Sequence, residues 1–146
     1  MHATIQLIAV LTCTLFTGAA IYINLVEHPA RMSCSTELAA TVWAPSYKRA
    51  TVMQVTLGVL STAAGIGSWL MTGEITWLIG TFLIFSVIPF TVIAILPTNN
   101  KLLDPKLDRT SVETRALLQK WARLHAVRSV LSLAASIVLL ASILFQ

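Results

Sequence analysis

The chain has 146 residues, of which 56% are hydrophobic and 11% are charged, and its mean hydropathy is +0.80. Soluble domains carry about 25% charged residues, so this composition excludes an ordinary soluble protein. It indicates an integral membrane protein with a single domain, residues 1–146. The net charge of +4 does not indicate a nucleic-acid partner, because the sequence has no nucleic-acid-binding motif and its basic residues follow a membrane pattern described below.

Four apolar stretches predict membrane-spanning helices, with the lipid bilayer as the first partner. Each has about the 20 residues needed to cross the hydrocarbon core, and they cover roughly residues 4–26, 50–71, 75–96 and 124–145. Four spans joined by short connections favour an all-α, four-helix membrane bundle of up-down-up-down topology.

A polar connection, residues 27–49, is expected between the first two spans. Pro29 disfavours helical geometry at the residue before it, so the first helix should end or kink near Glu27 and His28. Trp43 and Tyr47 fit aromatic anchors at the membrane interface better than substrate-stacking groups.

Small residues line one face of the second span. Such a face can pack within the bundle or against a second copy, so the sequence does not decide between a monomer and a homo-oligomer. The residues are Gly58, Ser61, Ala64, Gly65 and Ser68.

Turn signals separate the remaining spans. Gly73 predicts a tight turn after the second span, and Pro97 opens a turn-rich stretch that should end the third. Thr110 and Glu113 fit a capping box. The capping box precedes an amphipathic stretch, which predicts a short interfacial helix running into the fourth span.

The basic residues predict the orientation. All of them lie in residues 27–49 and 97–128, which four spans place on one side of the membrane. The positive-inside rule then puts both long loops in the cytoplasm and both termini outside, for a protein of the cytoplasmic (inner) membrane. The ten residues are Arg31, Lys48, Arg49, Lys101, Lys106, Arg109, Arg115, Lys120, Arg123 and Arg128.

The same end of the bundle should gather polar side chains that are expensive inside a membrane, and such groups are functional candidates by default. Two helical faces carry most of them, the first with spacing i, i+3, i+4, i+7 and the second with spacing i, i+4, i+7. The candidates are Asn24, Glu27, His28 and Arg31 from the first span, Tyr47, Arg49 and Gln54 near the second, Asn99 and Asn100 after the third, and Trp121, His125 and Arg128 on the fourth.

A metal site is one interpretation of this cluster. Glu27, His28 and His125 form a two-histidine, one-carboxylate set of the kind that holds iron and leaves positions open for oxygen. Against it, adjacent residues such as Glu27 and His28 diverge by about 100° on a regular helix. A single iron or copper ion, or no cofactor at all, is therefore left open, and the sequence has no flavin, haem or nucleotide motif.

An organic site is the second interpretation. Here His125 is a general base assisted by Glu27, since the ordinary pKa of histidine, about 6.5, lies near working pH. Arg128, Asn99 and Asn100 would hold a phenolate or carbonyl oxygen. Asn24, Trp121 and Tyr47 complete the predicted substrate-binding set.

A structural latch is the third interpretation. It consists of an ion pair between Glu27 and Arg128 and of hydrogen bonds between His125 and asparagine, which would only lock the helix ends. The protein would then be a non-catalytic assembly partner or a small-molecule binder or carrier.

Four polar segments resemble a family of small four-span membrane proteins. They are YINLVEHPAR (22–31), WAPSYKR (43–49), PTNNKL (97–102) and WARLHAVR (121–128). The named members of this family are anthrone oxygenases of fungal and bacterial polyketide pathways. The resemblance implies oxidation of an anthrone to an anthraquinone with molecular oxygen and without flavin or haem. It favours an enzyme acting on a lipophilic phenolic or quinone-like small molecule.

Overall fold

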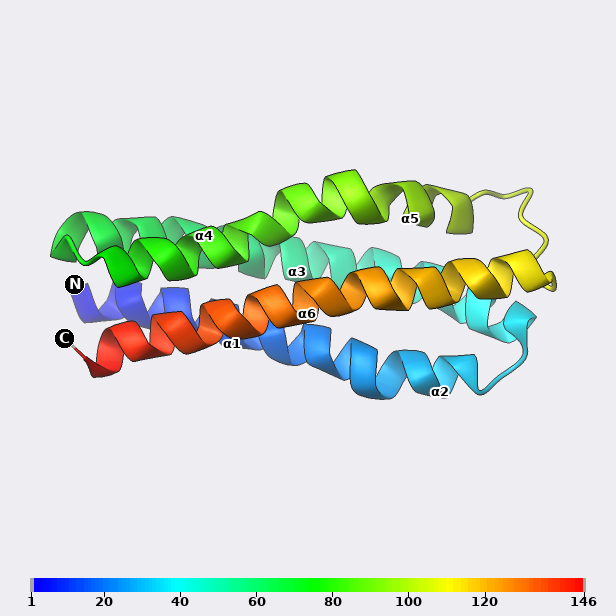
Figure 1. Cartoon of the computed structure of the whole chain (residues 1–146), viewed down its shortest axis with the longest axis horizontal. Coiled ribbons are helices and arrows are strands. Elements are labelled where there is room, and N and C mark those ends of the chain that lie inside the picture. Colours follow the sequence, from blue (N-terminus) through cyan, green and yellow to red (C-terminus); the bar gives the residue numbers. More distant parts are fainter. Residues whose placement is uncertain (1, 146) are drawn as a thin grey trace.

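The computed structural model describes residues 2–145, which form long helices without a β-strand in that range (Figure 1). The helices, with η marking a π-helical turn, are α1 (His2–Tyr22), η1 (Ile23–Glu27), α2 (His28–Met32), α3 (Thr36–Thr72), α4 (Ile75–Phe90), η2 (Thr91–Ile95), α5 (Leu96–Leu102) and α6 (Val112–Leu144). Segments α1–η1–α2 and α4–η2–α5 each run as one rod. With α3 and α6 they give four rods long and apolar enough to cross a membrane, which confirms the predicted fold class.

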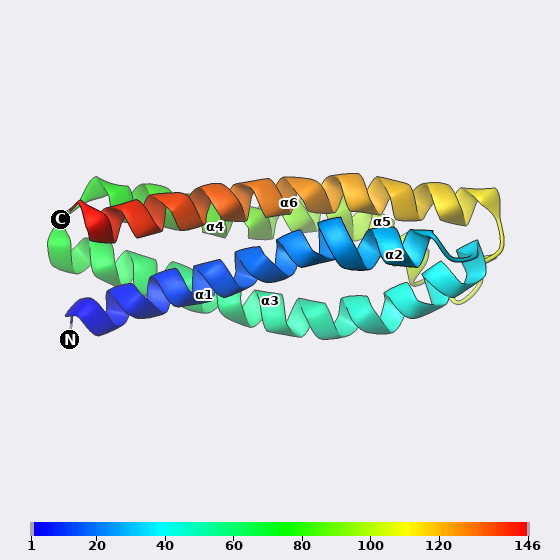
Figure 2. The same ribbon diagram turned by 90° about the horizontal axis from the view of Figure 1, so that it is seen from below.

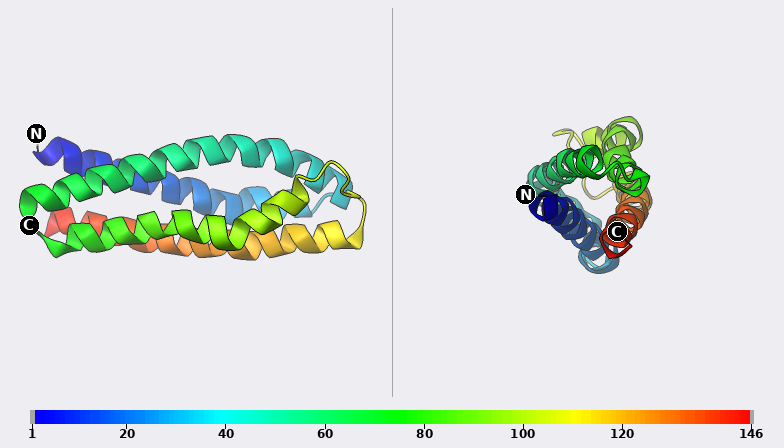
Figure 3. Two further views of the ribbon diagram at one scale, coloured as in Figure 1. Left: turned by 90° about the horizontal axis from the view of Figure 1, so that it is seen from above. Right: turned by 90° about the vertical axis from the view of Figure 1, so that its left-hand side faces the viewer.

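The rods form an antiparallel square. α1 packs against α3 and α6, and α4 packs against the same two helices, so α1 and α4 lie diagonally across the bundle (Figure 3). Both termini and the turn at Gly73 lie at one end, which we call the terminal end (Figures 1 and 2). The connections 33–35 and 103–111 lie at the other, the loop end. This is the predicted up-down-up-down order.

The helices continue through Pro29 and Pro97, so the predicted helix ends at these two prolines are wrong. Pro29 and Pro97 are each preceded by a π-helical turn, in which the N–H of His28 donates to the Ile23 carbonyl and that of Leu96 to the Thr91 carbonyl. A proline lacks an N–H and its ring clashes with the carbonyl four residues earlier. A locally widened turn removes that conflict, and the helix continues through Pro29 and Pro97.

The second and fourth rods are longer than expected. α3 begins at Thr36, capped by Ser35, whose hydroxyl accepts from the Leu38 N–H. Most of the predicted connection 27–49 is therefore helical. α6 likewise begins after Ser111, one residue beyond the predicted cap. The predicted interfacial helix is the first part of this same continuous helix and not a separate element.

The rods exceed the thickness of a membrane. The 37 residues of α3 span about 55 Å at 1.5 Å per residue, whereas the hydrocarbon core is about 30 Å thick. A rod of this length that crosses the hydrocarbon core therefore extends beyond it.

Small residues set the packing of the terminal half. Gly58, Ser61, Gly65 and Ser68 are all buried in the bundle, and the Ser61 hydroxyl donates to the Ala9 carbonyl at 3.0 Å. The face that could have served a homodimer is therefore used within one chain.

Gly80 on α4 tests this close packing. A Cβ there would lie 2.6 Å from Leu139 Cδ2 and 2.7 Å from its Cγ, whereas one at Gly18 would meet nothing within 4 Å. We expect Gly80→Ala to cost about 1–3 kcal/mol through overpacking, lowering the thermal unfolding midpoint in detergent. Gly18→Ala is the matched control and should not lower it. Equal midpoints for the two variants would contradict the packing of α4 against α6.

Candidate functional site

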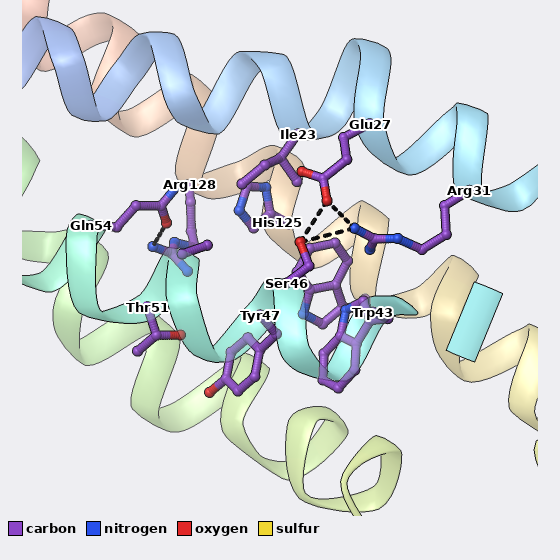
Figure 4. Close-up of a pocket in the computed structure, with 12 residues that line it drawn as sticks. Ile23, Glu27, Arg31, Trp43, Ser46, Tyr47, Thr51, Gln54, His125 and Arg128 are labelled. Carbon is purple, nitrogen blue, oxygen red and sulfur yellow. Dashed lines mark hydrogen bonds and ion pairs between the residues drawn. The ribbon is translucent and has the colours of Figure 1, made fainter. Parts of the chain in front are cut away.

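A small polar chamber lies toward the loop end, between η1, α3 and α6 (Figure 4). Its volume is about 20 Å³, enough for about one water-sized molecule. The lining residues are Ile23, Glu27, Arg31, Trp43, Ser46, Tyr47, Ala50, Thr51, Gln54, Trp121, His125 and Arg128. Five of the nine predicted catalytic or substrate-binding residues thus line one cavity, namely Glu27, Tyr47, Trp121, His125 and Arg128.

His125 is held from behind by Asn24. Its Nδ1 lies 2.6 Å from Asn24 Oδ1, which also accepts from the Ser129 hydroxyl at 2.7 Å. The Asn24 amide nitrogen donates to the Ala122 carbonyl at 3.0 Å. Exchanging the amide oxygen and nitrogen would place two acceptors against each other at Ala122, so the orientation of the amide is determined by its surroundings.

This contact selects the histidine tautomer. An amide oxygen can only accept, so the neutral His125 ring carries its proton on Nδ1. Nε2 is then the basic nitrogen, on a ring that is 1% exposed and lines the chamber. Ser129, which sequence reasoning missed, lies one helical turn after His125 and supports the same amide.

Glu27 pairs within its own rod. It forms an ion pair with Arg31 and accepts from the Ser46 hydroxyl at 2.6 Å (Figure 4). The predicted pair between Glu27 and Arg128 is therefore not formed. The i, i+4 spacing of Glu27 and Arg31 could have indicated the observed pair, whereas nothing in the sequence singled out Ser46.

Aromatic rings close the loop-end side of the chamber. Trp43 stacks on Tyr47 with centroids 4.9 Å apart, and Trp121 stacks on His125 at 4.8 Å and meets Trp43 edge-on at 5.7 Å. Trp43 is 0% exposed, so its prediction as an interface anchor is wrong. Asn99 lies behind this wall, fully buried, and donates to the Tyr47 hydroxyl at 3.0 Å.

Arg128 is a mostly buried cation without a carboxylate partner among residues 2–145, where the ion pair found joins Arg31 and Glu27. Its Nη2 donates to Gln54 Oε1 at 2.7 Å, and its guanidinium carbon lies 5.6 Å from the centre of the Phe16 ring. Burying a charge without a counter-ion is costly. An anionic ligand in the chamber would supply the negative charge that Arg128 lacks.

The chamber wall also has an excess of hydrogen-bond donors. Five of its buried N–H groups have no acceptor in the described structure, and each belongs to a lining residue. They are Arg31 Nε, Trp43 Nε1, Gln54 Nε2, Trp121 Nε1 and Arg128 Nε. Buried donors are normally paired, so this set favours a ligand rich in oxygen acceptors.

The predicted metal set is not assembled. His28 is buried, its ring packs 5.2 Å from Trp121, and both ring nitrogens lack partners. It lines a separate shallow groove with Arg115 and Arg123, and not the polar chamber. Within residues 2–145 no group of three or more His, Cys, Asp or Glu side chains is placed to hold a metal ion, so the arrangement gives the hypothesis no support. Asn100 is exposed and also lies apart from the chamber lining.

A second, apolar chamber of about 130 Å³ adjoins the first. Tyr47, Thr51, Gln54 and Arg128 line both. The remaining lining residues are largely aliphatic and come from α3, α4 and η2.

Comparison with known proteins gives two matches and one absence. The model of the anthrone oxygenase family matches residues 43–138. The anthrone oxygenase tpcL of Aspergillus fumigatus is 42% identical over 62 residues, which cover 40% of this chain and 38% of that relative. The match thus spans well under half of the relative's length. No solved structure matches the chain.

Removing the Glu27 carboxylate tests the local network. Glu27→Ala leaves the guanidinium of Arg31, whose side chain is 5% exposed, without its counter-ion. We expect a loss of about 1–3 kcal/mol in unfolding free energy, seen as a lower thermal midpoint. The exposed Glu37 provides the control, since Glu37→Ala should change stability by about 0.5 kcal/mol or less. A Glu27→Ala protein as stable as the control would contradict the network.

Proposed function

The chain belongs to the anthrone oxygenase family, and we propose that it is a membrane-embedded oxidoreductase that oxidises a lipophilic phenolic, anthrone- or quinone-like substrate with molecular oxygen. The observation that carries the proposal is the buried His125, whose Nδ1 proton is directed to Asn24 while the ring lines a chamber rich in unpaired donors. A base beside groups that accept negative charge suits a substrate that becomes an oxyanion when it loses a C–H proton.

The central methylene of an anthrone has this property, because its conjugate base is an aromatic phenolate. In the proposed reaction His125 Nε2 takes one methylene proton. The resulting carbanion reduces O2 in two one-electron steps and forms a C–O bond, and the imidazolium returns its proton to give a hydroperoxide on that carbon.

The second half of the reaction uses the same histidine. Nε2 takes the remaining C–H proton as the carbonyl forms, the O–O bond breaks and hydroxide leaves. Hydroxide then receives the proton from the imidazolium. One CH2 group and one O2 become one carbonyl and one water, and His125 ends in its starting state.

Arg128 and Gln54 are assigned to the developing phenolate. Both residues line the chamber and have a buried N–H group without an acceptor, and Arg128 supplies the positive charge. Tyr47 and Trp121 would bound the substrate ring, with Asn99 positioning Tyr47. Glu27 acts through Arg31 and Ser46 in this scheme, and not as a second base.

The proposal includes a membrane orientation. The ten Lys and Arg residues all belong to the loop half of the rods and its connections, which favours the loop end in the cytoplasm and both termini outside the cytoplasmic membrane. The site would then lie at the cytoplasmic boundary of the bilayer.

His125→Gln tests the base directly. We expect the rate of anthrone-dependent oxygen uptake by purified protein to fall about 10²–10⁴-fold, because glutamine cannot accept the proton. The thermal midpoint should stay near that of the unchanged protein. His2→Gln, a change to the histidine at the start of α1, should preserve the rate.

Other results would favour the competing interpretations. A large loss of stability in His125→Gln, together with no oxidation by the unchanged protein, would support a structural latch. Stoichiometric iron or copper that disappears in the variant would support a metal-dependent reaction.

Asn24 is a positioning residue, and two variants separate its roles. Asn24→Asp keeps an oxygen that accepts from His125 Nδ1 and should retain most of the oxidation rate. Asn24→Ala removes that acceptor, so the proton of neutral His125 is no longer confined to Nδ1 and Nε2 is not always the basic nitrogen. The rate should therefore fall by about tenfold or more. The measurement is kcat at saturating anthrone, beside the thermal midpoint of each variant. If the two variants lose the same share of the rate, Asn24 does not act through the tautomer.

A further inference from the structure

The apolar chamber opens on the side of the bundle that faces lipid. It lies between α3 and the α4–η2 segment, with Phe16 of α1 as its inner wall. Val55, Ile88 and Val92 line it and are 53%, 37% and 56% exposed on the bundle surface. Since these residues belong to membrane-spanning helices, a molecule entering between them comes from the acyl chains and not from water.

The inner side of the same chamber is polar. Gln54 and Arg128 separate it from the chamber that contains His125, and both line the two cavities. The Nε2 of Gln54 and the Nε of Arg128 are buried without acceptors. An occupant therefore needs an apolar body at the lipid side and an oxygen acceptor at the inner end.

We propose that this chamber is the binding site for a hydroxylated aromatic ring that enters laterally from the bilayer and directs its oxygen to Arg128 and Gln54. The inference rests on the proposed function in one respect, namely that the ring belongs to the molecule whose carbon reacts at His125. The volume of about 130 Å³ matches a cavity that holds about one benzene ring. The rest of a larger polycyclic substrate extends toward the lipid or the polar chamber.

Charge complementarity selects this occupant over a lipid chain. An acyl chain would fill the aliphatic part but would supply no negative charge to Arg128 and no acceptor to Arg128 Nε or Gln54 Nε2. A phenolate oxygen would supply both the negative charge and a hydrogen-bond acceptor, and the aromatic side chains of Phe16 and Tyr47 line the same chamber.

Gly58 controls the space in the chamber. It lies on the wall between Phe16 and the lipid-facing residues, and a Cβ there would approach Phe16 Cε2 only to 3.9 Å, which is ordinary contact. A larger side chain at this position would extend into the cavity without first meeting the backbone. Gly18, which meets nothing within 4 Å and is exposed, offers the same substitution on the outside of the bundle.

The test uses the full chain in lipid nanodiscs and a ligand that does not react. Binding of 1,8-dihydroxyanthraquinone is followed by quenching of tryptophan fluorescence, with Gly58→Leu compared with Gly18→Leu. We expect Gly58→Leu to weaken binding about tenfold or more, and Gly18→Leu to stay within about twofold of the unchanged protein. A Gly58→Leu protein that binds normally would overturn the proposal.

A second measurement keeps the proposal testable if Gly58→Leu does not fold. The unchanged protein should bind 1,8-dihydroxyanthraquinone more tightly than anthraquinone without hydroxyls, and Arg128→Gln should remove that preference. Equal affinity of the unchanged protein for the two ligands would overturn the proposal.

Anthrone oxidation, measured on the same samples, separates the two claims. Binding that depends on Gly58 and Arg128 without any oxidation would support the chamber and contradict the oxygenase function. Oxidation that is unaffected by Gly58→Leu in a stable protein would support the oxygenase function and contradict substrate binding in the apolar chamber.

Discussion

The structure depends on how two helices accommodate proline. Pro29 and Pro97 each lack a backbone donor, and each is preceded by a π-helical turn that lets the rod continue toward the loop end. These turns lie on α1 and α4, the diagonal pair of the bundle, and both contact α6. The first turn contains Asn24 and Glu27, and the second borders the apolar chamber with Thr91. π-Helical turns often occur at functional sites, and here the two turns frame the same pair of cavities.

The electrostatics of the chamber follow from this frame. Glu27 is held by Arg31 and Ser46 on the loop-end side, so it does not neutralise Arg128 on the other side. The result is an uneven site, with a compensated ion pair at one end and an uncompensated cation at the other. A ligand that develops negative charge only during reaction is stabilised most when the charge appears. This distribution of charge, together with a base fixed by Asn24, distinguishes the cluster from a simple lock between helix ends.

Sequence reasoning predicted the four spans, the turn at Gly73 and the gathering of polar residues, because hydropathy and glycine chemistry are local properties. It left open whether the first helix ends or kinks at Pro29, since the rule for proline describes α-helical geometry and not a widened turn. The partner of Glu27 depends on how the rods are rotated about their axes, and the burial of Trp43 depends on the helical extension of α3 beyond the bilayer. The pairs Asn24–His125 and Gln54–Arg128 join residues far apart in the chain, so one sequence alone does not reveal them.

The length of the rods has a consequence for how substrate reaches the site and how product leaves it. Because α3 is about 55 Å long and the hydrocarbon layer is about 30 Å thick, the proposed membrane orientation would put both cavities near the edge of that layer. Their apolar opening at Val55 and Ile88 would face the lipid, and the arginine and aromatic side chains of the polar chamber would lie toward the loop end. A lipid-soluble molecule is concentrated on the first side. Under the proposed chemistry a CH2 group becomes a neutral carbonyl, so substrate and product are both lipid-soluble ring systems, and both would pass between the apolar chamber and the acyl chains without crossing the loop end.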